Sequence, residues 1–127
     1  MAGATMTFEE ATWKSGVKRI KASWLSDDAT GAVSGTTEYK YTGQLVRLVT
    51  DPGANAPDDN YDLVVNDSDS VDTLMGGGLN RDTTNTEQVL GTSLGVVFDS
   101  KLTFAITNAG NAKNGTVYLY ITPYRDF

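Results

Sequence analysis

The sequence contains no cysteine and no histidine, and these two absences exclude a wide range of chemistry. Without cysteine the chain can form no disulfide and provide no thiolate ligand to a metal. Without histidine it lacks the commonest general base and the commonest transition-metal ligand, and it cannot form a Ser–His or Cys–His pair. Since no other catalytic motif is present, the sequence predicts a protein that is not an enzyme and that holds no cofactor and no metal.

Long hydrophobic runs are also missing. No stretch approaches the ~20 apolar residues that a transmembrane helix needs. The first residues, MAGATMTFEEATWKSG, lack the basic and apolar regions of a signal peptide. We therefore expect no membrane partner and a protein that assembles in a cytoplasm.

Basic residues are few, and the charge is uneven along the chain. The formal net charge is −6. Residues 51–90 carry nine acids and one base, Arg81, which gives −8, whereas residues 1–25 carry four bases and two acids, which gives +2. An acidic protein of this kind is repelled by phosphate backbones, so we expect no nucleic-acid partner.

The hydrophobic pattern has a period of two, which is typical of strands with one buried face. The segments with this pattern, or rich in β-branched residues, are Thr5–Trp13, Lys18–Leu25, Thr36–Tyr41, Leu45–Thr50, Tyr61–Val65, Val96–Phe98, Leu102–Thr107 and Val117–Thr122. Asn114-Gly115 is a turn signal that predicts a hairpin between the last two of these segments. Short strands without long amphipathic helices predict an all-β fold, an antiparallel, jelly-roll-like β-sandwich. We expect one domain over residues 1–127, with the option of an extended N-terminal arm over about residues 1–15.

The glycine-rich stretch DTLMGGGLNRDTTNTEQVL, residues 72–90, resembles a phosphate-binding loop only superficially. A phosphate loop needs a lysine and a hydroxyl directly after its last glycine. Here Leu79, Asn80 and Arg81 follow Gly78, so the stretch predicts a sharp turn instead. The Thr84-x-x-Glu87 pattern is a capping box, and it predicts one short helical turn near residues 85–90.

The acidic segment over residues 58–72 raises the question of a calcium site, because calcium binds several carboxylate oxygens. The twelve-residue calcium loop requires Asp-x-(Asp/Asn)-x-(Asp/Asn)-Gly. Starting at Asp67, the chain has Val71 and Asp72 at the fifth and sixth positions. The motif therefore fails and a solvated acidic loop is favoured, although the sequence alone leaves calcium open.

Tyrosines gather on one side of the predicted strands. Tyr118, Tyr120 and Tyr124 share the period-two face opposite the Val/Leu/Ile face, and Tyr39 and Tyr41 repeat the spacing. Tyrosine is enriched at protein interfaces and in sugar-binding sites, so three interpretations stay open: an interface, sugar stacking, or packing. The candidate interface residues are Trp13, Lys18, Lys21, Tyr39, Tyr41, Tyr118 and Tyr120.

The run NYDLVVNDSDSVDTLMGGGLNRDTTNTEQV, Asn60–Val89, resembles small bacteriophage proteins encoded among virion structural genes. The nearest functional comparison is with the capsid decoration, or cement, proteins of tailed phages. The resemblance covers about a quarter of the chain and carries no active-site residue. It implies a small β-sandwich on the capsid surface of a virion, assembled in the bacterial host cytoplasm. The implied partners are the major capsid protein and further copies of this chain, as a dimer or trimer.

Two functions therefore remain open at this point. The first is a capsid cement protein that stabilises the joints between capsomers. The second is a carbohydrate- or receptor-binding module of a phage tail or tail fibre. If the protein is a capsid cement protein, residues 51–90, with their net charge of −8, are expected to face solvent or a basic patch. The basic residues near the N-terminus are then expected to lie nearer an acidic capsid surface; they are Lys14, Lys18, Arg19 and Lys21.

Overall fold

Hydrophobic and polar residues that alternate along the sequence also alternate between the core and the surface of the fold. The computed structural model describes residues 4–123. In β2 (Lys18–Leu25) and β9 (Asn114–Thr122) every second side chain is buried, because neighbouring residues of a strand point to opposite faces of the sheet. The predicted all-β class is confirmed, since the described residues form strands in two antiparallel sheets and one short 3₁₀ turn.

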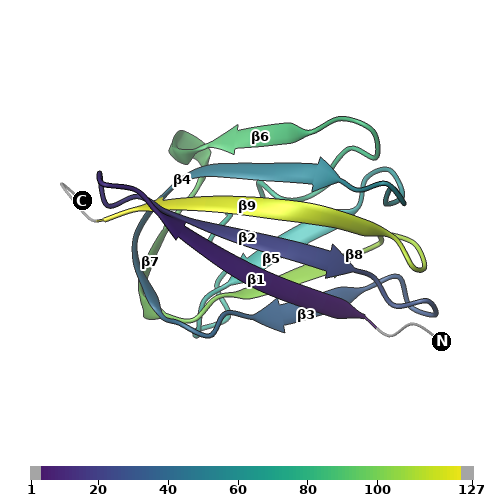
Figure 1. Ribbon diagram of the computed structural model, residues 1–127, viewed down its shortest axis with the longest axis horizontal. Helices are drawn as coiled ribbons and strands as arrows, with labels where there is room; N and C mark the ends of the chain where they lie inside the picture. The colour runs from purple at the N-terminus through teal and green to yellow at the C-terminus, as the bar shows by residue number, and fades with distance from the viewer. Residues whose placement is uncertain (1–3, 124–127) are drawn as a thin grey trace.

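The two sheets differ in size (Figure 1). The larger sheet has the order β1-β2-β9-β4-β6, with β7 paired to the first part of β4, and the smaller sheet has the order β3-β8-β5. The remaining bounds are β1 (Thr5–Thr12), β3 (Val33–Thr36), β4 (Tyr41–Pro52), β5 (Asp62–Asn66), β6 (Glu87–Leu90), the 3₁₀ turn η1 (Gly91–Ser93), β7 (Val96–Ser100) and β8 (Thr103–Thr107). Most connections pass from one sheet to the other, so β1 and β2 are the only consecutive paired strands of the described chain.

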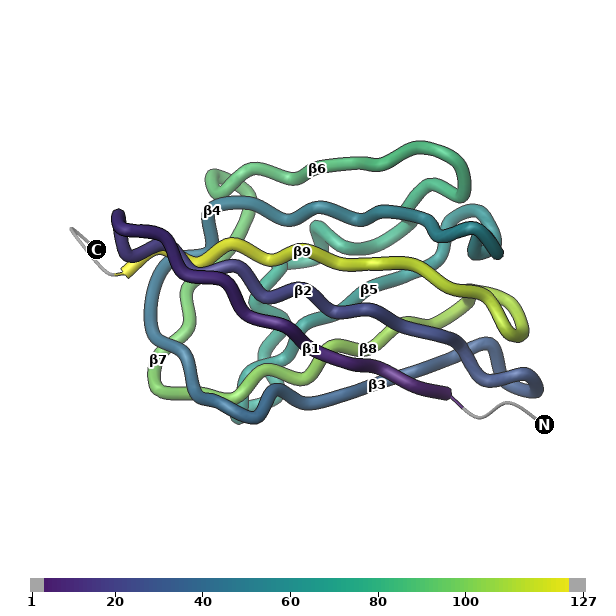
Figure 2. The backbone as a smooth tube through the Cα atoms, in the orientation of Figure 1, coloured from purple at the N-terminus to yellow at the C-terminus, as the bar shows by residue number. Residues whose placement is uncertain are grey.

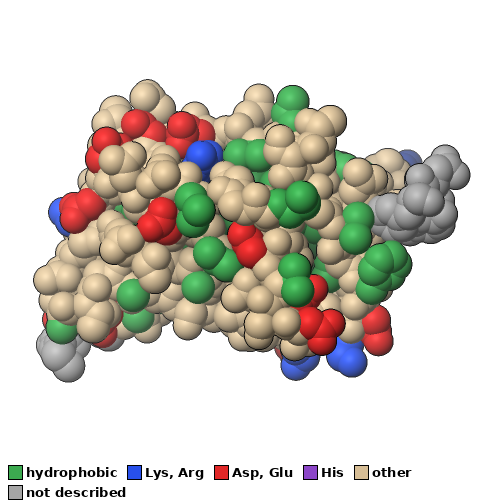
Figure 3. All heavy atoms as spheres, turned by 180° about the vertical axis from the view of Figure 1, so that it is seen from behind, with side chains coloured by type: hydrophobic (Ala, Val, Ile, Leu, Met, Phe, Trp, Pro, Cys, Tyr) green, Lys and Arg blue, Asp and Glu red, His purple; other side chains and the backbone are tan. Residues whose placement is uncertain are grey.

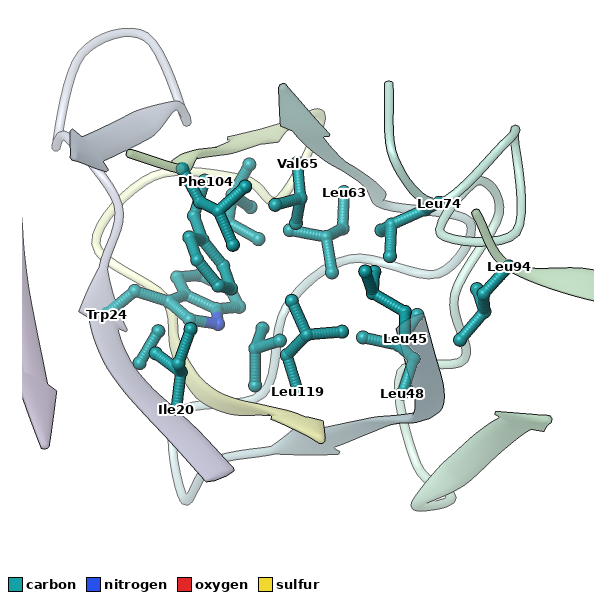
Figure 4. Packing of buried hydrophobic residues seen from close by; sticks show 14 of the residues in the cluster. Ile20, Trp24, Leu45, Leu48, Leu63, Val65, Leu74, Leu94, Phe104 and Leu119 are labelled. Carbon is teal, nitrogen blue, oxygen red and sulfur yellow. The ribbon is translucent and has the colours of Figure 1, made fainter. Parts of the chain in front are cut away.

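The core lies between the two sheets. Leu45, Leu48 and Leu119 of the larger sheet face Leu63 and Phe104 of the smaller one (Figure 4). All five side chains are completely buried. Burial of one such side chain stabilises the fold by about 1.5–3 kcal/mol, so this layer accounts for much of the cohesion between the sheets.

Strand β4 is long and bent, and it changes partner along its length (Figure 2). Its first residues pair with β7, and Arg47–Thr50 pair with β6. The bend includes Gly43, which has φ +154° and whose missing Cβ would lie 2.1 Å from the carbonyl oxygen of Thr122. Only glycine fits this approach, so the residue is required for β4 to pass close to β9.

After β5 the chain returns along that strand as an irregular crossover. Leu63 donates its backbone N–H to the carbonyl of Gly78 at 2.8 Å, and Arg81 donates to Tyr61 at 2.7 Å. The crossover therefore covers the free edge of β5, which protects the smaller sheet from pairing with other chains.

The three glycines of this crossover form a turn, as the sequence predicts. Gly76 has φ +82°, a conformation that favours glycine. A Cβ on Gly78 would lie 2.3 Å from the carbonyl oxygen of Leu63, so no side chain fits there. One glycine is needed for its backbone angle and the other for close approach to β5.

The predicted helical turn near residues 85–90 is wrong. Glu87–Leu90 form strand β6, paired antiparallel with Arg47–Thr50, and the 3₁₀ turn begins only at Gly91. The capping box does not form, because Glu87 accepts a hydrogen bond from the backbone N–H of Asp82 at 2.9 Å. Pairing with a central strand overrides the weak local preference for a helix.

The structure also differs from the predicted hairpin, from one predicted strand and from the expected N-terminal arm. Asn114-Gly115 lie within β9 opposite Leu25 and Trp24, so β8 and β9 form no hairpin and belong to different sheets. The predicted strand Thr36–Tyr41 is divided between the end of β3 and the start of β4. Within the segment expected as an N-terminal arm, Thr5–Thr12 lie in the sheet, paired along their whole length with β2.

Candidate protein-binding surface

The outer face of the larger sheet is the side that packs against no other layer (Figure 1). Because Ile20 and Leu119 point into the core, their strand neighbours Arg19 and Tyr120 point outward. The strand register then fixes the neighbours across the sheet: Tyr120 lies opposite Arg19 on one side and Arg47 on the other. This face therefore carries a row of arginine and aromatic side chains.

Five residues of this face form a continuous stack, here named the arginine–aromatic ladder: Trp13, Arg19, Arg47, Tyr118 and Tyr120. The guanidinium of Arg47 lies 5.3 Å from the ring centre of Tyr120. The Tyr120 ring stacks on Trp13, with centres 6.2 Å apart and planes inclined by 23°. Cation–π contacts of this length are worth about 0.5–1 kcal/mol at exposed sites, so together they favour the stacked arrangement of the ladder side chains.

Arg19 lies between two rings. Its guanidinium carbon is 5.7 Å from the ring centre of Trp13 and 5.1 Å from that of Tyr118. The Nε atom is buried and has no hydrogen-bond partner among the described residues. Arg19 is thus held in place by its neighbours while one of its donors remains unsatisfied.

Apolar and paired charged residues surround the ladder. Val49, opposite Tyr118, is only 8% exposed although it lies outside the core cluster, which means that the outer-face side chains cover it. Lys21, on the other side of Tyr118, forms an ion pair with Glu9 at 3.7 Å. Trp13 itself is 46% exposed at the β1–β2 turn. The surface combines a partly apolar centre with charges at its margin, which is the usual anatomy of a protein interface.

The structure brings together four of the candidate interface residues: Trp13, Lys21, Tyr118 and Tyr120. Tyr124, which the sequence places on the same face, lies outside the described residues. Lys18, Tyr39 and Tyr41 belong elsewhere, because Lys18 is on the inward side of β2 and Tyr41 is buried at the start of β4.

Tyr41 and Lys18 form a separate cluster at one end of the sandwich. The Tyr41 hydroxyl donates a hydrogen bond to Oε2 of Glu10 at 2.6 Å. Lys18 lies 3.9 Å from the same carboxylate and 5.9 Å from the Tyr41 ring centre. Burial and the hydrogen bond to Glu10 hold the pKa of Tyr41 well above its ordinary value. Tyr39 is 61% exposed in the preceding loop, so the predicted pairing of Tyr39 with Tyr41 on one face is wrong.

Sequence reasoning misses Arg47 and the position of Arg19 between two rings. Alternation along β2 places Arg19 beside Lys21 on the outer face, but it does not say which strand lies next to it. The register of β2, β9 and β4 decides that Arg19 meets tyrosines, and this pairing spans residues far apart in sequence.

The acidic segment has a structural role that its composition does not suggest. Asp72 accepts hydrogen bonds from the backbone N–H groups of Val65, Leu74 and Gly76. Asp82 accepts two such bonds, from Asn85 and Thr84, which lower the pKa of its carboxyl. Asp72 and Asp82 therefore stabilise turns of the crossover. Among residues 4–123 no group of acidic side chains is arranged to hold a metal ion.

Surface cavities do not coincide with the ladder. A pocket of about 250 Å³ lies between Lys18, Lys40, Tyr41 and Pro123, and an open groove of about 390 Å³ runs over Gly115 at the other end of the larger sheet. Neither brings together an acid and a base in the way that hydrolytic chemistry needs. No ladder residue lines either cavity, which suits contact with a macromolecule better than capture of a small molecule.

Comparison with protein-family models, curated proteins and solved structures found no match to this chain. The described part of the chain also contains no helix that is long and apolar enough to cross a bilayer.

Proposed function

We propose that this protein is a non-enzymatic structural protein of a bacteriophage virion, a capsid decoration protein that binds the outer shell and stabilises the joints between capsomers. The observation that carries the proposal is the arginine–aromatic ladder on the uncovered face of the larger sheet. Trp, Tyr and Arg are the residues most enriched among those that dominate binding energy at protein interfaces. The resemblance of Asn60–Val89 to virion proteins supports the viral setting.

The ladder is pre-organised for docking. Its rings and guanidinium groups already contact one another, so binding immobilises fewer side chains than a set of free rotamers would. The major capsid protein is the expected partner, and copies of this chain are expected to assemble as a dimer or trimer, since one patch can be reused around a symmetry axis.

Binding would stabilise the shell by mass action. A protein that binds only the assembled shell stabilises each site by about 2.7 kcal/mol when its free concentration is a hundredfold above Kd. Repeated over many joints, this stabilisation raises the temperature at which heads release their packed DNA.

The test is to strip the protein from phage heads, add it back and measure DNA release on heating. We expect restored heads to hold their DNA to a higher temperature than stripped heads. Equal release temperatures with and without bound protein would rule out a cementing role.

The second candidate is a carbohydrate-binding module of a tail or tail fibre. It is favoured by Trp13, whose ring is 46% exposed and stacked on Tyr120, because aromatic rings at a surface are suited to stacking on sugars. A glycan array and the copy number per particle separate the two. Hundreds of copies without glycan binding indicate a shell protein, and a few copies with glycan binding indicate a tail module.

A further inference from the structure

The two arginines of the ladder have no acidic partner within residues 4–123. The described residues form three ion pairs, Lys18–Glu10, Lys21–Glu9 and Arg81–Glu87. Arg19 and Arg47 take part in none of them. The chain as a whole has a net charge of −6, so acids are plentiful, yet neither guanidinium on this face is neutralised by one within residues 4–123.

The hydrogen-bonding capacity of both arginines is also largely unused. Arg47 donates its Nε–H to the side-chain oxygen of Gln88 at 2.9 Å, and Arg19 donates to no described residue. A guanidinium carries five N–H donors in a planar fork that matches a carboxylate. The neighbouring rings contact each guanidinium and restrict its side chain, so binding a carboxylate orders the arginine less than it would a free one.

We propose that the arginine–aromatic ladder docks onto an acidic protein surface, whose carboxylates are bound by Arg19 and Arg47 while the rings of Trp13, Tyr118 and Tyr120 pack around them. This inference depends on the proposed function, because it specifies the chemistry of the capsid surface at the same site. Charge complementarity supports it, since two guanidinium groups that no acid of residues 4–123 neutralises lie together on the outer face of the larger sheet.

A protein partner fits the surface better than a nucleic acid. An arginine–aromatic surface can also stack on bases. However, Glu9 pairs with Lys21 at the margin of the ladder, and Asp51 lies on the same face opposite Thr116, so the border of the surface is not uniformly basic. A phosphate backbone would meet these acids and the −8 of residues 51–90, whereas isolated carboxylates can be directed to the two arginines.

The first arm of the test measures binding of variants to stripped heads at low and high salt. Arg19→Gln and Arg47→Gln each remove one charge, and the matched control Lys101→Gln removes one charge from an exposed residue between β7 and β8. We expect each arginine variant to bind roughly tenfold or more weakly at low salt, with a smaller loss at high salt, while the control binds like the wild type. Arg19→Lys keeps the charge but not the fork, and it should bind between Arg19→Gln and the wild type.

Equal binding by all four variants would overturn the inference but leave the proposed function standing. Failure of the wild type to bind heads would instead remove the proposed function, and a second arm then decides the inference separately.

The second arm uses the unmodified chain and an oligoglutamate peptide as the probe. The NMR signals of the Nε–H groups of Arg19 and Arg47 are followed during titration, with sodium chloride at matched ionic strength as the control. We expect both signals to shift with the peptide and not with the salt. No shift with the peptide, or shifts with an oligothymidylate alone, would contradict docking on an acidic protein; the latter outcome would identify a nucleic-acid surface.

Discussion

The guanidinium of Arg19 lies 5.1 Å from the ring centre of Tyr118, although the two residues are almost a whole chain apart in sequence. The contact exists because β9 is inserted beside β2 in the larger sheet. It joins β2 and β9, the second and the last strands of the described chain, into one surface, and it defines the centre of the proposed docking site.

Tyr118→Leu should lower the free energy of unfolding by about 0.5–1 kcal/mol, because it removes the cation–π contact with Arg19 while keeping an apolar side chain. Tyr39→Leu is the matched control, since Tyr39 is 61% exposed and lies outside the ladder. Urea unfolding of both variants measures the difference. Equal losses in the two would mean that the stacking on Arg19 contributes nothing to stability.

The crossover glycines should differ sharply in their tolerance of a side chain. Gly78→Ala places a Cβ 2.3 Å from the carbonyl oxygen of Leu63 and should cost about 3 kcal/mol. Gly76→Asn should cost less than about 1 kcal/mol, because nothing lies within 4 Å and asparagine tolerates positive φ. Thermal unfolding of the two variants checks the order, and a reversed order would contradict the described turn.

The period-two pattern predicts the strands well because burial of one face is decided locally. It identifies β2, β8 and β9 and their buried residues, such as Ile20, Phe104 and Leu119. Two other local signals give wrong predictions. The capping-box pattern predicts a helical turn at Glu87–Leu90, where pairing with β4 imposes a strand. The hairpin signal at Asn114-Gly115 lies inside a paired strand.

Only part of the candidate surface can be predicted from the sequence, because the pairing of strands is not decided locally. The tyrosines of β9 are recognisable from their spacing. Their arginine neighbours depend on which strands pair and in which register, and those pairings connect distant segments. Tyr41 shows the opposite error: its spacing matches Tyr39, but the start of β4 turns its ring into the core.

Asp72→Ala should lower the free energy of unfolding by about 1–3 kcal/mol, since three backbone N–H groups lose their acceptor. Asp69→Ala removes the same charge from an exposed residue of the same segment and should change stability little. Calcium should leave the melting temperature of both variants and of the wild type unchanged. A rise with calcium that disappears in either variant would show that the acidic segment binds the ion.

Alkali should unfold the protein in part through Tyr61. Burial raises the pKa of Tyr61 to about 12 from its ordinary 10.0. Because the folded state holds the proton more tightly, the stabilisation is fully present below pH 10 and is lost as the pH rises from 10 to about 12. The contribution is about 3 kcal/mol, since a shift of one pKa unit corresponds to about 1.4 kcal/mol.

Tyr61→Phe removes this titrating group, so its stability should fall less steeply with pH over that range. Urea unfolding at a series of alkaline pH values measures the slope. Identical slopes for the variant and the wild type would show that Tyr61 does not titrate as its burial implies.

The orientation of the protein on a particle tests the central claim most directly. A cryo-electron microscopy map of the phage that carries this protein, at a resolution that separates the two sheets, should show many copies at capsomer joints. The outer face of the larger sheet, with Trp13, Tyr118 and Tyr120, should lie against the shell, and the opposite side, over which acidic side chains are spread, should face solvent (Figure 3). Copies that present the ladder to solvent, or a shell without the protein, would contradict the account.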